Sequence, residues 1–256
     1  MTHNHELVRA ALDAVDRGDA VVVATVVETE RSVPRHAGSK MLVFADRRQV
    51  GTIGGGEMES RVIDAAVDVL TSGAPRLVSF DLVDPVAGDP GVCGGTITLY
   101  LEPLLPDPSV VVVGCGHVGK AVSDLAHWLG YRVTAIDDRA ELATADQLPT
   151  ADQVLAGPIP DMMGRAAITD QTHIVLVTRN FAVDLDAIPA ALATSARSIG
   201  VMGSKRRWAH TRERLLELGV AAEQLDRLRS PIGLEIVAET PEQIAMSIMA
   251  EITALG

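Results

Sequence analysis

The sequence has few aromatic residues and few cysteines. Phe, Trp and Tyr make up 3% of its 256 residues, which argues against a nucleic-acid surface built on stacked rings. The two cysteines, Cys93 and Cys115, are too few for a disulfide framework. Each thiol is therefore read either as a core side chain or as a functional group.

Positive charge and long apolar runs are also scarce. Lys and Arg number 22 against 34 Asp and Glu, which gives a formal net charge of −12, so a broad basic face for a polyanion is not expected. No apolar run approaches membrane-spanning length, and the polar residues 1–6 do not resemble a signal peptide. These absences predict a cytoplasmic protein with no membrane and no nucleic acid among its partners.

The clearest motif is a glycine-rich turn after the apolar run 109–113. Gly114 permits a tight turn off a strand, Gly116 lets a pyrophosphate approach the backbone, and Gly119 lets a helix pack closely. Asp137 ends the next apolar run about 20 residues on, where an acid accepts a ribose hydroxyl. This context predicts a Rossmann-type unit with phosphates at a helix N-terminus.

Four more side chains near such turns have two interpretations each. Cys115 is either a small apolar filler or a sulfur near a ligand, and His117 either contacts a phosphate or caps the helix. Lys205 and Arg206 open a predicted helix, where positive charge opposes the helix dipole. That placement favours an anionic ligand over a merely solvated face.

A second glycine loop lies in residues 50–59 and also opens a predicted helix. Gly54, Gly55 and Gly56 are consecutive, which indicates a sharp bend or close approach of a ligand to the backbone. The helix start is again a ready anion site. Glu59 in the first turn either complements the helix dipole or hydrogen-bonds a polar ring.

Two further segments of the first half contain functional candidates. Residues 29–40 form a predicted loop with Arg31, Arg35 and Lys40, either a solvated surface or an anion clamp. Cys93 lies in a Cys-Gly-Gly sequence on a predicted loop, a setting that suits a reactive or metal-facing sulfur. Burial is the commoner fate of a free cysteine.

The order of predicted elements indicates two domains. The Pro-rich segment 103–108 is the best linker and predicts an N-terminal α/β domain over 1–105 and a second domain over 106–256. In the second, alternating strands and helices predict a Rossmann-like, doubly wound parallel sheet, with 198–202 as its final strand. Thr240 and Gln243 predict a capping box for an amphipathic helix, which makes a homodimer plausible.

Several segments together resemble the XdhC/CoxI family of xanthine dehydrogenase accessory proteins, in the family's order along the chain. They are residues 51–59, 93–95 with 102–103, 114–119 with 136–139, 200–206, 230–233 and 240–252. The resemblance implies a cytoplasmic chaperone that binds molybdenum cofactor (molybdopterin) and supports its sulfuration and insertion. The implied partners are a xanthine dehydrogenase-type apo-enzyme and a cysteine desulfurase-type sulfur donor.

Under this resemblance the glycine loops, Glu59 and Asp137 are candidate cofactor contacts, and either Cys93 or Cys115 supplies a sulfur near the metal, with Cys93 as the candidate metal contact. The other candidate cofactor contacts are His117, Lys205 and Arg206. Family members are not expected to turn over a substrate. Two other classes stay open. One is an NAD(P)-dependent oxidoreductase, which the sequence supports with its fingerprint but with no convincing proton donor. The other is a nucleotide-sensing regulatory or scaffold protein.

Overall fold

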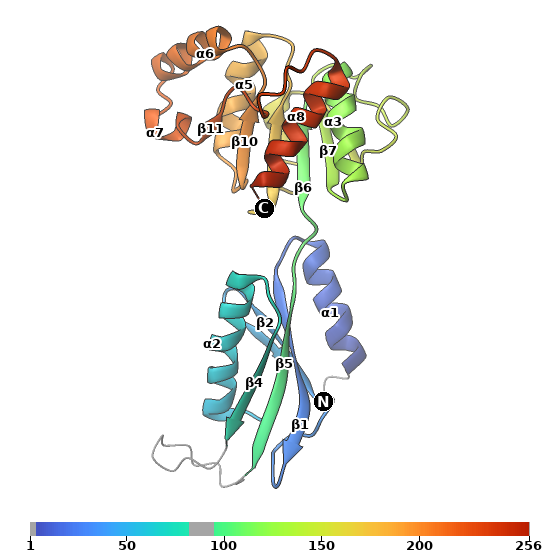
Figure 1. The fold of residues 1–256 in the computed structure, drawn as a ribbon, viewed down its shortest axis with the longest axis vertical. Helices are drawn as coiled ribbons and strands as arrows, with labels where there is room; N and C mark the ends of the chain where they lie inside the picture. The colour runs from blue at the N-terminus through green and yellow to red at the C-terminus, as the bar shows by residue number, and fades with distance from the viewer. Residues whose placement is uncertain (1–3, 82–94, 256) are drawn as a thin grey trace. The chain divides into compact units, whose positions relative to one another are not determined.

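The computed structural model describes residues 4–81 and 95–255, and the chain divides into two compact units, Met1–Pro106 and Asp107–Gly256 (Figure 1). Each buried hydrophobic cluster among the described residues belongs to one unit only. Each unit therefore has its own core. None of the described helices combines the length and the apolar character of a membrane-spanning helix.

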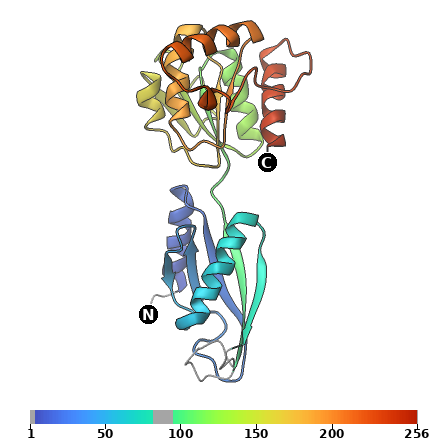
Figure 2. The same cartoon turned by 90° about the vertical axis from the view of Figure 1, so that its left-hand side faces the viewer.

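The first unit is an antiparallel five-stranded sheet in the order β3-β2-β1-β5-β4. Its strands are β1 (Val21–Glu30), β2 (Lys40–Phe44), β3 (Gln49–Gly51), β4 (Arg76–Asp81) and β5 (Thr96–Leu104), and its helices are α1 (Asn4–Asp16) and α2 (Gly56–Ser72). Val22 and Ala24 of β1 pack in the cluster that contains α2, while Val21 packs with α1. Successive side chains of a strand point to opposite faces, so the two helices cover opposite faces of the sheet (Figure 2).

The second unit is a parallel six-stranded sheet in the order β8-β7-β6-β9-β10-β11. Its strands are β6 (Ser109–Val113), β7 (Arg132–Asp137), β8 (Gln153–Ala156), β9 (Thr172–Leu176), β10 (Ser198–Val201) and β11 (Leu228–Arg229). This is the strand order of dinucleotide-binding Rossmann sheets, with the reversal between β6 and β9. The predicted fold class, an α/β unit followed by a Rossmann-like unit, is confirmed.

Helices cover both faces of this sheet. They are α3 (His117–Trp128), α4 (Ile159–Met163), α5 (Phe181–Leu192), α6 (Lys205–Glu217), α7 (Ala222–Leu225) and α8 (Pro241–Ala254). Val110 and Val112 of β6 pack with α3 and α8, whereas Val111 and Val113 pack with α4, α5 and α6. The run of valines predicted as a strand is therefore buried on both faces.

Two sequence predictions concern the end of the second unit, and one of them is confirmed. The prediction that 198–202 forms the final strand is wrong, because β11 follows and pairs parallel with β10. A two-residue strand has no periodicity that a sequence could reveal. The capping box is confirmed: the Thr240 hydroxyl accepts from the Gln243 amide, and the Gln243 side chain accepts from the Thr240 amide.

Candidate functional site

The turn after β6 uses its glycines for two different purposes. A Cβ on Gly114, whose φ is 110°, would lie 2.6 Å from the Val177 carbonyl oxygen, and a Cβ on Gly119 would overlap the Gly114 oxygen. Those two glycines therefore allow the strand, turn and helix to pack. Gly116 has a φ of −74°, and a Cβ there would meet no atom within 4 Å. Its backbone is open for a ligand to approach.

The helices that follow the two glycine loops lack a side-chain N-cap. Gly116 precedes α3 and Gly55 precedes α2, and neither helix receives a capping bond from a side chain. The short helices α4 and α7 also lack such a cap, whereas α5, α6 and α8 are capped by Asn180, Ser204 and Thr240. Because the first-turn amides of a helix need an acceptor, the described part of the chain leaves α2 and α3 suited to an external anion.

Asp137 ends β7 at the predicted position, and its carboxylate is fully engaged within the protein. One oxygen accepts from the Cys115 amide at 2.7 Å and from Nη2 of Arg139 at 2.9 Å. The other accepts from the backbone amide and Nε of Arg139, each at 2.9 Å. The side chain is 2% exposed. A ribose hydroxyl could reach Asp137 only if Arg139 moved, so the predicted ribose contact stays a prediction.

Cys115 lies in a small apolar cluster with Ala135, Ala143 and Leu148. Burial, together with the negative charge of Asp137, raises the pKa of its thiol to about 12. At neutral pH the group is therefore a protonated thiol enclosed by apolar side chains. This surrounding matches the interpretation of Cys115 as a small filler.

Charged side chains line the carboxyl edge of the second sheet, where such sheets bind ligands. Arg179, just after β9, makes a two-pronged ion pair with Asp138 at 2.6 and 2.8 Å. The hydrogen bond from Arg179 holds the pKa of Asp138 down at about 2. His117 is exposed at the start of α3. The edge therefore carries His117 and two Arg–Asp pairs, Arg139 with Asp137 and Arg179 with Asp138.

The basic start of α6 divides into two kinds of residue. Lys205 and Arg206 are exposed, and their role toward an anion stays a prediction. Arg207 turns inward and bonds both Asp184 of α5, at 2.6 Å, and the Thr178 hydroxyl, at 2.9 Å. Sequence reasoning missed Arg207, because an acid in the first turn of α5 is already accounted for by the helix dipole and gives no signal of a cationic partner.

In the first unit, Glu59 folds the glycine loop around its own carboxylate. Oε1 accepts from the amides of Ile53 at 3.0 Å, Gly54 at 3.2 Å and Gly55 at 2.9 Å. The Thr52 hydroxyl bonds the same oxygen, and Gln49 donates to the other. Glu59 is 8% exposed, so its observed role is to fix the loop. A contact with a ring ligand stays a prediction.

Other predicted segments meet the glycine loop at the same end of the first unit. A Cβ on Gly54 would lie 2.6 Å from Cγ of Pro34, and one on Gly95 would overlap the carbonyl of Glu30. Gly95 belongs to the Cys-Gly-Gly sequence, whereas Cys93 and Gly94 lie outside the described residues. The structure thus joins the basic loop to the glycine loop and to the end of the Cys-Gly-Gly segment.

The cationic side chains of this basic loop differ in position. Lys40 donates to the Thr25 hydroxyl at 2.8 Å, inside the sheet. Arg31 is exposed and has a φ of 60°, a backbone conformation that costs a non-glycine residue energy and often marks functional loops. Gly55 and Gly56 also face open space. Within the described ranges, no three His, Cys, Asp or Glu residues gather as metal ligands.

Comparison with known proteins identifies the family. The XdhC Rossmann domain family matches residues 110–252, and the XdhC and CoxI family matches residues 14–81. The chain belongs to the XdhC/CoxI family. The expected resemblance is therefore confirmed over parts of both units.

Three curated relatives of this XdhC/CoxI member differ in how much of their length it covers. The molybdenum cofactor insertion chaperone PaoD of Escherichia coli (strain K12) is 26% identical, over 100% of this chain and 90% of PaoD. The uncharacterized protein YqeB of the same organism is 32% identical over 90% of this chain and 42% of YqeB. A probable xanthine dehydrogenase subunit from Bacillus subtilis (strain 168) is 28% identical over 61% of this chain and 46% of its own. The chain thus spans less than half the length of two of the three.

A solved structure shows the same fold for this XdhC/CoxI member. A crystal structure from Bacillus halodurans, described as a xanthine dehydrogenase, aligns over 99% of this chain and 96% of its own. The TM-score is 0.51 and the sequence identity is 23%. At that identity the likeness supports the fold and says nothing of activity.

Proposed function

We propose that this protein binds molybdenum cofactor as cargo and assists its sulfuration and insertion into a xanthine dehydrogenase-type apo-enzyme. Membership of the XdhC/CoxI family supports this role. So does the relative that is named a molybdenum cofactor insertion chaperone and aligns over nearly its full length. A cytoplasmic location, a homodimer and a cysteine desulfurase-type sulfur donor are parts of the same proposal.

The observation that carries the proposal is the pair of uncapped helix starts after glycine loops. Molybdopterin ends in a phosphate, and helix N-termini with free amides bind phosphates. Gly116 adds an open backbone at α3. We assign the phosphate to this turn, with His117, Lys205 and Arg206 as exposed candidate contacts. The glycine loop at Gly54–Gly56 is the second candidate anion site, although its Gly54 and Gly55 amides already donate to Glu59 and leave only the amides from Gly56 onward for a ligand.

The sulfur contact falls to Cys93 in this proposal. Cys115 is buried and its pKa is raised to about 12, and a thiol needs its deprotonated form to bind metal or carry sulfur. Cys93 is the other cysteine of the chain. Its position lies outside the described residues, so the assignment rests on chemistry and on the family motif.

An NAD(P)-dependent oxidoreductase is the second candidate, which the strand order of the second sheet favours. The engaged carboxylate of Asp137 weighs against it, because dinucleotide sites use that acid for the ribose. A nucleotide-sensing scaffold would share the same turn. Competition between molybdenum cofactor and NAD separates these two functions from the chaperone proposal.

The test is anaerobic binding of isolated molybdenum cofactor to the wild type and to Gly116→Ala, with NAD as competitor. The new methyl group meets no protein atom, so it obstructs an incoming phosphate and leaves the fold intact. We expect affinity to fall about tenfold or more, the effect of losing hydrogen bonds to a charged group. Gly164→Ala is the matched control, because Gly164 has a similar φ of −66° at the end of α4.

Capture of the cofactor that weakens in Gly116→Ala and not in Gly164→Ala supports both the chaperone role and the assigned turn. Equal binding by the two variants would show that the phosphate does not bind at this turn. Failure of the wild type to capture cofactor, combined with saturable NAD binding, would overturn the chaperone proposal. If Cys93→Ala binds the cofactor as tightly as the wild type, the proposal that the Cys93 sulfur contacts the cofactor is contradicted.

A further inference from the structure

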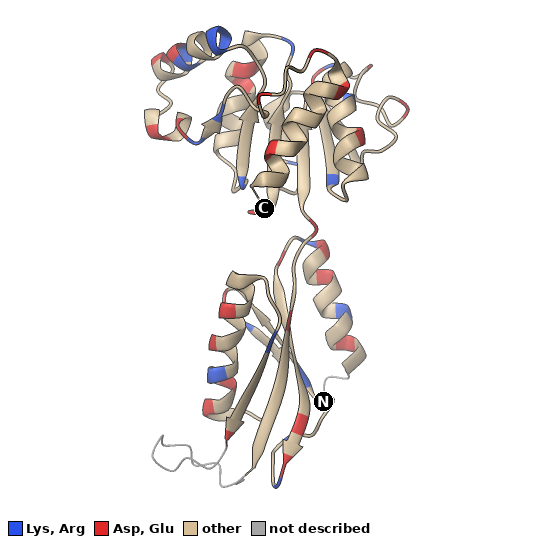
Figure 3. Ribbon diagram, viewed as in Figure 1, with Lys and Arg blue, Asp and Glu red and all other residues tan. Residues whose placement is uncertain are grey.

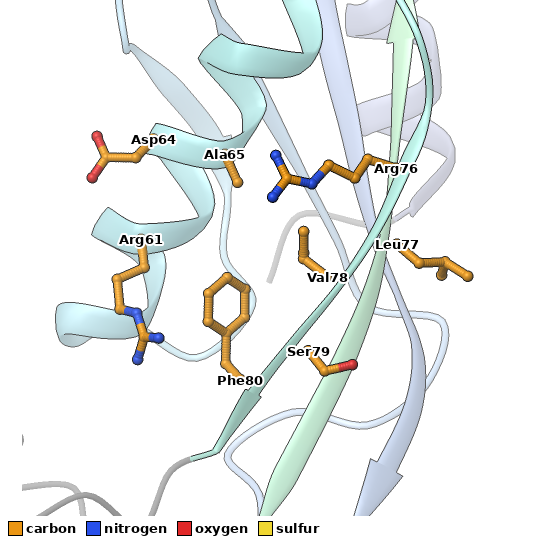
Figure 4. Close-up of a pocket in the computed structure, with 8 residues that line it drawn as sticks. All are labelled: Arg61, Asp64, Ala65, Arg76, Leu77, Val78, Ser79 and Phe80. Carbon is orange, nitrogen blue, oxygen red and sulfur yellow. The ribbon is translucent and has the colours of Figure 1, made fainter.

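A hollow of about 480 Å³ lies between α2 and the edge strand β4 of the first unit (Figure 4). From β4, Arg76, Val78 and Phe80 point into it, because alternate side chains of a strand share a face. Leu77 and Ser79 point to the other side of the strand. From α2, Arg61 faces Phe80 across the hollow, which thus has an apolar floor and a basic rim.

The two arginines of this rim have no carboxylate partner within the described residues. Arg61 lies over the ring of Phe80, with its Cζ 4.9 Å from the centroid. Asp64, the acid nearest to them in the lining, is already paired with Arg47. Arg61 is the only basic residue of α2, which is otherwise rich in acids (Figure 3). Carboxylates from outside the chain could therefore pair with these two guanidinium groups.

Within the part of the chain that the structure describes, the hollow runs beside an open strand edge. Among the described strands, β4 pairs only with β5. About half of the backbone N–H and C=O groups of such a strand point away from its neighbour and are a template for another strand. Leu77 is 63% exposed on the same strand. The edge of β4 thus combines backbone hydrogen-bonding groups with the apolar side chains and the two arginines that line the hollow.

We propose that β4 takes up an extended acidic segment of a partner protein as an added strand. Carboxylates of that segment bind Arg61 and Arg76, and an apolar side chain next to them packs on Phe80 and Val78. Backbone hydrogen bonds supply affinity in this mode of recognition, and side-chain pockets supply specificity. The charge of the rim selects acidic segments, because a basic strand would meet like charge directly.

The competing explanation is that Arg76 only protects the edge, since charged side chains on edge strands prevent aggregation. That role needs one charge and no second arginine from the facing helix. It also predicts that no strand binds, whatever its charge. The two explanations therefore differ in a measurable way, and neither depends on cofactor binding.

The probe is a fluorescent peptide of about six residues, the usual strand length, with Glu at its first and fifth positions, Val at its third and Thr between them, so that Glu and Val share one face. Anisotropy measures its binding to the full chain, beside versions with Gln or Lys in place of Glu. We expect only the Glu peptide to bind, and Arg61→Gln and Arg76→Gln each to weaken it about tenfold. The control is Arg9→Gln, at an exposed position of α1. It makes the same charge change and should leave binding unchanged.

Hydrogen exchange supplies the second readout. The Glu peptide should slow amide exchange in residues 76–81, whereas free glutamate should not. A charge exchange completes the set: Arg76→Glu should lose the Glu peptide and gain the Lys peptide. The proposal is overturned if the Glu peptide fails to bind, if the Gln peptide binds equally well, or if binding leaves exchange in β4 unchanged.

Discussion

Glu59 shows how much one side chain decides in the first unit. Burial raises the pKa of its carboxyl group, but the hydrogen bonds from Thr52, Gln49 and the loop amides outweigh burial and leave the pKa lowered. A group with a lowered folded pKa stabilises the fold above its unfolded pKa and loses that contribution as pH falls through the folded value. The glycine loop is therefore most firmly held at neutral pH.

Glu59→Ala should destabilise the first unit by about 2 kcal/mol at neutral pH, because loop amides lose their acceptor. Glu59→Gln should show a weaker loss of stability than the wild type as pH falls below the ordinary value of 4.5. Urea unfolding at a series of pH values measures both effects. Glu57→Gln, exposed in the same first turn, is the control, and an equal effect there would contradict the role of Glu59.

At the scale of elements, the ion pair of Arg207 with Asp184 joins α6 to α5 and to the end of β9. Asp184 is 1% exposed, and a buried charge left without its partner is costly. Arg207→Ala should lower the free energy of unfolding by about 3–5 kcal/mol. Arg206→Ala, next to it and exposed, should change it by at most about 0.5 kcal/mol. Equal losses in the two variants, measured by denaturant unfolding, would show that the pair does not join the elements.

These elements also show what a sequence can and cannot predict. Long apolar runs and Gly-x-Gly-x-x-Gly placed β6, α3 and β7 correctly, because their periodicity and turn chemistry are local. Only the fold shows which of three consecutive basic residues turns inward, since that depends on the phase of α6 against α5. The engagement of Asp137 by Arg139 was equally hidden, because it depends on a side chain that turns back on its own strand end.

At the scale of the whole molecule, the chain divides into two compact units, Met1–Pro106 and Asp107–Gly256. Whether the parts fold independently is a prediction. Fragments 1–106 and 107–256 should each unfold cooperatively, because each contains complete hydrophobic clusters. Circular dichroism and thermal melts of the two fragments measure this. A fragment that is unstructured alone would show that its core needs the other.

The place of α8 has a consequence for how the protein is made. Its residues Ala245, Ile248 and Met249 cover the face of the second sheet to which Val110 and Val112 of β6 belong. A ribosome delivers β6 long before α8, so that apolar face stays uncovered beside α3 while the intervening segments are synthesised. The first unit, whose last strand ends at Leu104, is complete by then. We therefore expect nascent chains to pass through a stage in which the first unit is complete and the second exposes an apolar face that chaperones can bind.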